Sequence, residues 1–110
     1  MINQLRVYKI FPETAQAFHD RFRDHAARIM DRHGFRIQAM WETGEGETLS
    51  FVYLLAWEDE AEMTGRWASF MADEEWIEIK KNTKEQPMVG GIEEMVLRPT
   101  DYSAAIGGAG

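Results

Sequence analysis

The stretch Phe51–Trp76, FVYLLAWEDEAEMTGRWASFMADEEW, contains the pattern that decides the fold. Its first part, Phe51–Trp57, is apolar at every position, which is typical of a strand buried on both faces. The acidic residues Glu58, Asp59 and Glu60 follow, where carboxylates favour the N-terminus of a helix. Large apolar residues then recur at helical spacing, at Met63, Trp67, Phe70 and Met71. The stretch predicts a central strand, from about residue 48, followed by a helix.

The residues before this stretch predict a strand, a helix and a second strand. Residues 3–11 alternate in character and are rich in β-formers, which indicates the first strand. A helix is expected from Pro12 through about Arg32, with Gly34 as its C-terminal stop. Residues 35–43 again alternate, with Phe35, Ile37, Ala39 and Trp41 on one face. The turn at residues 44–47 contains two glycines that can take positive φ, so the next strand is expected to return as a hairpin.

After the central helix, Asp73 is expected to be the N-cap of a further short helix. A loop over residues 82–87 and a last strand over residues 88–98, ended by Pro99, complete the pattern. The order β-α-β-β-α-β predicts an α+β, ferredoxin-like plait: a four-stranded antiparallel sheet with strands one and three in the middle and helices on one face. We expect one domain over residues 1–99 and a flexible tail over residues 100–110.

Composition excludes several classes of protein. The chain has 110 residues, a net charge of −7 and no cysteine. The acidic balance disfavours nucleic acid and anionic membranes as partners, because both need clustered Lys and Arg. The lack of cysteine excludes disulfides and thiolate sites. We find neither a secretory start nor a membrane-spanning run nor a cofactor-binding motif, and we expect a cytoplasmic protein without a cofactor.

Six short motifs, taken together in their order along the chain, resemble the NIPSNAP family over nearly the whole chain. They are Leu5-Arg6-Val7-Tyr8, Arg32-His33-Gly34, Leu55-Ala56-Trp57-Glu58, Arg66-Trp67, Asp73-Glu74-Glu75-Trp76 and Leu97-Arg98-Pro99. The resemblance implies a homodimer whose paired sheets enclose a dimeric α+β barrel. Related barrels include cofactor-free monooxygenases, haem-degrading enzymes and isomerases. The chain departs from the family pattern at Tyr53, where many members carry histidine, so no role of that histidine transfers.

A homodimer is also expected on physical grounds. Helices cover one face of such a sheet, and the other face here still carries large apolar side chains. An exposed apolar face of this kind usually marks an interface, and a second copy of the chain is the expected partner.

His25 and Tyr53 are the candidate catalytic residues. At 100° per residue from Phe18, His25 falls in the middle of the apolar helix face, where a buried imidazole could do acid or base work. The alternative is a core histidine bonded to a backbone carbonyl or a carboxylate. A metal site is not expected, because His19 and His25 lie about 9 Å apart along the helix axis.

Arg6, Tyr8, Trp41 and Trp57 are the candidate ligand-binding residues. If Leu5 and Val7 meet the helices, Arg6 and Tyr8 point into the barrel, where they could bind an anionic ligand. The alternative is an ion pair between Arg6 and Glu93 or Glu94 that stabilises the dimer. Tyr53, Trp41 and Trp57 could line an apolar pocket or could pack in the core.

Two functions follow from these candidates. In the first, each subunit of a homodimer binds a small, largely apolar ligand between sheet and helices, with cofactor-independent oxygenase or isomerase chemistry. In the second, the protein is a noncatalytic dimeric interaction module whose interior is filled by its own side chains. An enclosed cavity with an unpaired polar group favours the first function, and a solid interior favours the second.

Overall fold

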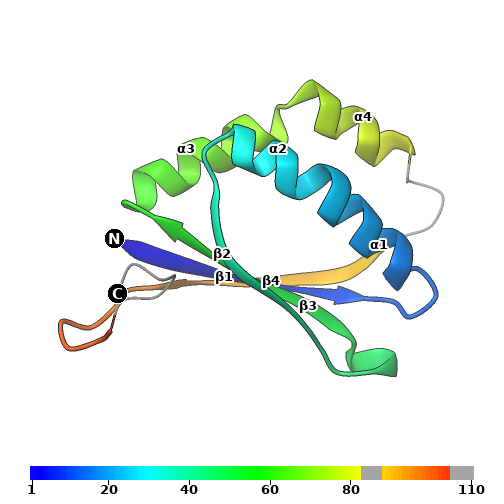
Figure 1. Ribbon diagram of the computed structural model, residues 1–110, viewed down its shortest axis with the longest axis horizontal. Coiled ribbons are helices and arrows are strands. Elements are labelled where there is room, and N and C mark those ends of the chain that lie inside the picture. Colours follow the sequence, from blue (N-terminus) through cyan, green and yellow to red (C-terminus); the bar gives the residue numbers. More distant parts are fainter. Residues whose placement is uncertain (83–87, 105–110) are drawn as a thin grey trace.

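The computed structural model, which describes residues 1–82 and 88–104, shows a four-stranded antiparallel sheet with helices on one face (Figure 1). The strands β1 (Ile2–Ile10), β2 (Arg36–Thr43), β3 (Ser50–Trp57) and β4 (Val89–Leu97) lie in the order β2-β3-β1-β4. This confirms the ferredoxin-like plait with the first and third strands in the middle. Most of the expected loop over residues 82–87, and the tail from residue 105, lie outside the described residues.

The first helix consists of α1 (Ala15–Arg21), a π-helical segment (Phe22–Ala26) and α2 (Ala27–Arg32). It begins three residues later than expected, because Pro12 lies in a turn closed by a hydrogen bond from the Thr14 amide to the Phe11 carbonyl, 3.1 Å long. The fixed φ of proline suits the second position of such a turn. The expected stop at Gly34 is confirmed by its φ of 85°.

The π-helical segment moves His25 away from the position that helical periodicity predicts. Hydrogen bonds of the i→i+5 type widen the turn, so each residue advances by a smaller angle than in an α-helix. Phe22 and Ala26 are buried, whereas His25 between them is exposed. Its Nδ1 lies 3.2 Å from the Arg28 guanidinium. The expectation that this imidazole projects into the core is therefore wrong.

An irregularity in β2 has a similar effect on Trp41. The pairing with β3 shifts between Ile37 and Ala39, which is the signature of a β-bulge. Ile37 pairs with Leu55 on the helix-covered face, but Trp41 pairs with Val52 on the opposite face. The expected grouping of Ile37 and Trp41 on one face is wrong for this reason.

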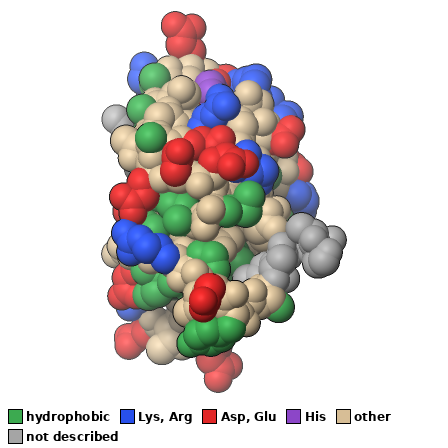
Figure 2. All heavy atoms as spheres, turned by 90° about the vertical axis from the view of Figure 1, so that its left-hand side faces the viewer, with side chains coloured by type: hydrophobic (Ala, Val, Ile, Leu, Met, Phe, Trp, Pro, Cys, Tyr) green, Lys and Arg blue, Asp and Glu red, His purple; other side chains and the backbone are tan. Residues whose placement is uncertain are grey.

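The face of the sheet opposite the helices carries apolar side chains that no described helix covers. On β3, Phe51, Tyr53, Leu55 and Trp57 point to the helices and are at most 5% exposed. The opposite face carries Trp41, Met95 and Leu97, which are 51%, 52% and 38% exposed. Figure 2 shows hydrophobic side chains gathered in the middle and lower part of one side of the molecule, below the more charged helical layer. We call the face opposite the helices the open face.

The second helical pair, α3 (Glu60–Met71) and α4 (Glu74–Asn82), completes the covering layer. Helix α3 begins at Glu60 and not at Glu58, because Asp59 is its N-cap and accepts a 2.8 Å hydrogen bond from the Glu62 amide. The expected N-cap at Asp73 is confirmed by a 3.1 Å hydrogen bond from the Trp76 amide.

Asp73 also joins α4 to α2 through charged partners. Its other carboxylate oxygen lies 2.7 Å from His33 Nε2 and 2.8 Å from the Arg32 guanidinium. Hydrogen bonds from His33, Arg32 and the Trp76 amide hold the pKa of Asp73 well below its usual value. This carboxylate is therefore ionised at physiological pH.

We expect this linkage to make stability fall in acid. Because the folded-state pKa is depressed, the contribution of Asp73 is complete above the unfolded-state value of about 3.9 and declines below it. D73N retains an oxygen for the cap but loses the charge that pairs with His33 and Arg32. It should therefore unfold at a lower temperature than wild type at pH 6. Its unfolding temperature should also fall less than that of wild type between pH 5 and pH 3. Thermal unfolding of wild type, D73N and the control E74Q measures this. A D73N protein with the wild-type pH profile would contradict the assignment.

Candidate functional site

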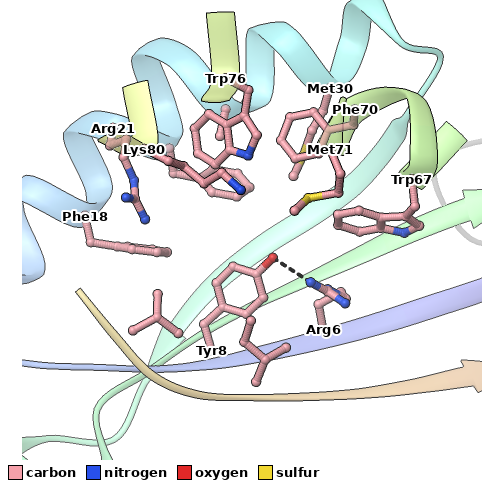
Figure 3. A pocket seen from close by; sticks show the side chains of 14 residues that line it. Arg6, Tyr8, Phe18, Arg21, Met30, Trp67, Phe70, Met71, Trp76 and Lys80 are labelled. Atoms are coloured by element: carbon pink, nitrogen blue, oxygen red, sulfur yellow. Dashed lines mark hydrogen bonds between the residues drawn. The ribbon is translucent and has the colours of Figure 1, made fainter. Parts of the chain in front are cut away.

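A cavity of about 210 Å³ lies between the sheet and the helices (Figure 3). Its floor comes from β1 and β4 and its roof from every helix of the covering layer, so both layers contribute to it. Met71 and Ile92 are 48% and 55% exposed, which places them at the mouth. The lining consists of Arg6, Tyr8, Phe18, Arg21, Phe22, Ala26, Met30, Trp67, Phe70, Met71, Trp76, Lys80, Val89 and Ile92.

The lining is mostly aromatic and aliphatic, with cationic groups and one phenol. Arg21 and Lys80 lie over the Trp76 ring, 5.5 Å and 5.9 Å from its centroid. Arg6 lies over Trp67 at 4.3 Å. Among the described lining residues there is no carboxylate. The cavity therefore suits an apolar body that carries an electron-rich polar group.

The polar corner of the cavity is built on β1 by Arg6 and Tyr8. Strand alternation points both side chains toward the helices, and Figure 3 shows the Tyr8 oxygen directed into the cavity beside Arg6. An Arg6 terminal nitrogen donates a 3.0 Å hydrogen bond to the Tyr8 hydroxyl, which lies 2.7 Å from the Tyr53 hydroxyl. Arg6 also pairs with Glu94 on β4. Its Nε is buried without a hydrogen-bond partner among the described residues.

Burial and neighbouring groups fix the charge states of this corner. Burial raises the pKa of Tyr53 well above its usual value, and the Tyr8 hydroxyl adds to that shift. Tyr53 is thus a neutral phenol at physiological pH. Burial lowers the pKa of Arg6, but Tyr8, Tyr53 and Glu94 more than offset this, so the net shift is upward. Burial lowers the pKa of Arg21, an effect that Tyr8 opposes.

Gln4, one pleat before Arg6, holds the aromatic wall in place. Its side chain is buried, and its Oε1 accepts hydrogen bonds from the indoles of Trp57, at 3.1 Å, and Trp67, at 2.8 Å. Its Nε2 donates to Glu94 at 3.0 Å. One amide therefore orients the ring that stacks on Arg6 and the carboxylate that pairs with it.

The structure brings together only some of the residues predicted from sequence. Arg6 and Tyr8 line the cavity, and Tyr53 lies directly behind Tyr8. The condition under which they were considered, that Leu5 and Val7 meet the helices, is not met: the side chains of Arg6 and Tyr8 face the helices, whereas Leu5 and Val7 are on the open face. The anticipated pair of Arg6 with a β4 glutamate is present, with Glu94.

The other predicted site residues lie away from the cavity. His25 is exposed on the outer side of the helix, and Trp41 is on the open face. Trp57 does face the helices, but it is fully buried at the far end of β3, where it packs against Phe35. Its ring fills the core and does not border the cavity.

Sequence reasoning missed Gln4, Arg21, Lys80 and the lining roles of Trp67 and Trp76. A usable signal existed for Gln4, since it shares its strand face with Arg6 and Tyr8. Arg21 is flanked by Phe18 and Phe22, and Lys80 lies one turn after Trp76, which could have indicated cations at the edge of an apolar helix face.

The described part of the chain contains neither a cluster of metal ligands nor a membrane-spanning helix. Over residues 1–82 and 88–104, no three His, Asp or Glu side chains are grouped as a metal would require. No helix in those same ranges has the length and apolar character needed to cross a membrane.

Comparisons with known proteins agree on the fold. The NIPSNAP family model matches residues 3–104. An uncharacterized NIPSNAP-like domain protein from Burkholderia xenovorans superposes with a TM-score of 0.80 at 24% identity, covering 96% of this chain and 90% of that one. A search of curated proteins gives no match.

More distant structures share the fold at lower similarity. A Streptomyces coelicolor monooxygenase from the gene ActVA-Orf6, in complex with Nanaomycin D, has a TM-score of 0.60 and 13% identity over 94% of this chain and 91% of that one. MhuD, with two manganese protoporphyrin IX molecules per active site, has a TM-score of 0.63 and 12% identity over 96% of this chain and 100% of that one. At these identities the likeness shows the fold alone.

Proposed function

The chain belongs to the NIPSNAP family, and from this premise we propose that it forms a homodimeric barrel that binds a small, largely apolar ligand in each subunit. The observation that carries the proposal is the cavity of about 210 Å³ between sheet and helices. Most of its lining is aromatic or aliphatic, and its few polar groups converge at one corner, as in small-molecule sites generally.

The chemistry we propose is cofactor-independent oxygenase or isomerase chemistry on the bound ligand. Reactions of this kind pass through species with negative charge on a ligand oxygen, and donors fixed around that oxygen lower the barrier. Tyr8 is such a donor. Arg6 and Tyr53 hold its hydroxyl in place, and Arg6 in turn pairs with Glu94. The fold shared with a monooxygenase that holds Nanaomycin D supports the same class of reaction.

The homodimer part of the proposal rests on the open face. Trp41 and Val52 are cross-strand partners there, and Val52 also pairs with Val7 on β1. These side chains form a continuous apolar surface across β2, β3 and β1. In a monomer this surface would be exposed to water. A second copy that packs the same face against it would bury both surfaces at once.

The alternative, a noncatalytic interaction module, predicts a solid interior with every buried polar group satisfied. The cavity counts against it. So do the buried Arg6 Nε and Thr14 Oγ1, which have no hydrogen-bond partner among the described residues. We therefore favour ligand binding.

A substitution at the mouth tests the binding proposal. M71W places an indole over the entrance, and it should weaken binding of the bicyclic hydrocarbon tetralin by about tenfold or more, because the probe and the indole compete for the same space. Isothermal titration calorimetry measures the affinity. The control is M40W, since Met40 is 51% exposed but does not line the cavity. Equal tetralin affinity in wild type and M71W, or a failure of wild type to bind, would contradict the proposal.

A further inference from the structure

The Tyr8 hydroxyl has two neighbours whose roles can be assigned from chemistry. Arginine has no acceptor atom, so the 3.0 Å bond between Arg6 and Tyr8 is donated by the guanidinium. The 2.7 Å contact between the Tyr8 and Tyr53 hydroxyls is formally open to either direction. That direction decides whether Tyr8 has a proton to offer to a ligand.

Burial of Tyr53 settles the direction. Its side chain is 0% exposed, and its hydroxyl finds no acceptor among the described residues other than the Tyr8 oxygen. If Tyr8 were the donor, the Tyr53 proton would be buried without an acceptor, which proteins avoid. Burial raises the pKa of Tyr53 well above its usual value, so at physiological pH its hydroxyl carries this proton. Tyr53 therefore donates to Tyr8.

The Tyr8 oxygen then accepts two hydrogen bonds, one from Arg6 and one from Tyr53, and its own proton must go elsewhere. Tyr8 lines the cavity, and its oxygen points into it (Figure 3). The described lining offers this proton no carboxylate, amide or carbonyl side chain. A corner made only of donors is suited to an acceptor that arrives with the ligand.

We propose that the Tyr8 hydroxyl donates a hydrogen bond to a carbonyl or enolate oxygen of an apolar cyclic ligand. Tyr53 and Arg6 are positioning residues that hold and polarise the phenol. This assignment rests on the proposed function and names the polar group that the ligand carries. Two donors on the phenol oxygen stabilise negative charge there, so the Tyr8 hydroxyl is a stronger hydrogen-bond donor than an isolated phenol. Tyr53 does not border the cavity and acts only through Tyr8.

A matched pair of probes tests this: 1-tetralone, which carries a carbonyl, and tetralin, the same skeleton without it. Wild type should bind 1-tetralone about tenfold more tightly than tetralin, because the buried donor is paired only in the first complex. Y8F should bring this ratio close to one, and because the ratio compares two ligands in the same variant, a general change of the cavity cancels from it. Y53F should lower the ratio only a few-fold, because Arg6 still orients the phenol.

The infrared carbonyl stretch of bound 1-tetralone separates the two hydrogen-bond directions. The stretch should be shifted down most in wild type, less in Y53F and not at all in Y8F. If Tyr8 instead donates to Tyr53, Y53F would free the Tyr8 proton and increase both the ratio and the shift, which would overturn the assignment. Equal binding of both probes by wild type would also overturn it while leaving the cavity intact. Binding of neither probe would reject the proposed function and this assignment with it.

Discussion

Replacing Gln4 with methionine is expected to lower the free energy of unfolding by at least about 1–3 kcal/mol, which is the cost of leaving one buried indole donor unpaired. A second, partly buried indole donor adds a smaller cost. The donors are the Nε1 groups of Trp57 and Trp67, which share the Gln4 oxygen. Methionine keeps the length of the side chain, so packing changes little and the loss reports on hydrogen bonding.

Urea unfolding of wild type and Q4M gives this difference. Q16M is the matched control, since Gln16 is exposed and bonds only to Asp20 in the described structure. Q4M should also weaken the stacking of Trp67 on Arg6 and thereby disturb the cavity. A Q4M protein as stable as Q16M would show that the amide does not hold the two indoles.

The second large effect is expected at the open face, where W41E should convert the proposed homodimer into a monomer. Trp41 is 51% exposed in the single chain and stands beside Val52 on the apolar surface. In a symmetric interface the substitution places two unpaired carboxylates in the contact, and removing each of them from water costs several kcal/mol, which opposes association.

Sedimentation equilibrium at micromolar concentration measures the change. Wild type should show a mass of about twice 12.7 kDa, and W41E should show the single value. M40E is the control, because Met40 has the same exposure and precedes Trp41 on the same strand but points to the helix side. A monomeric wild type, or a W41E protein that remains dimeric, would contradict the proposed interface.

Element order and two helix ends were predictable because each has a local signal, and the sheet order followed from the element order. Asp73 has a side chain that can cap the N-terminus of a helix. Gly34 can take the positive φ that ends a helix. The central position of β3 followed from its apolar residues on both faces.

Two register changes were not predictable by counting. The π-helical segment at Phe22–Ala26 and the bulge after Ile37 each shift the periodicity, and they misplaced His25 and Trp41 respectively. Counting at a fixed angle per residue assumes a regular helix or strand, so it cannot predict either irregularity.

Part of the candidate site could be predicted from the sequence, but the face of β1 that meets the helices could not. Arg6 and Tyr8 were identified as functional candidates on the condition that Leu5 and Val7 face the helices, and that condition is not met. The inward face instead carries Gln4, Arg6 and Tyr8, which are tolerated there because they pair with Glu94, Tyr53 and two indoles. Hydropathy alone cannot distinguish a paired polar group in the core from an exposed one.

The central claim, that a small apolar ligand occupies the cavity beside Tyr8, is tested most directly by nitrogen-15 NMR of the four tryptophan indoles during titration with tetralin. Trp67 and Trp76 line the cavity, whereas Trp41 and Trp57 do not. We predict saturable shifts of the Trp67 and Trp76 indole signals and a much smaller response from Trp41 and Trp57. Shifts confined to Trp41, or no saturable shift of any indole signal, would contradict the claim.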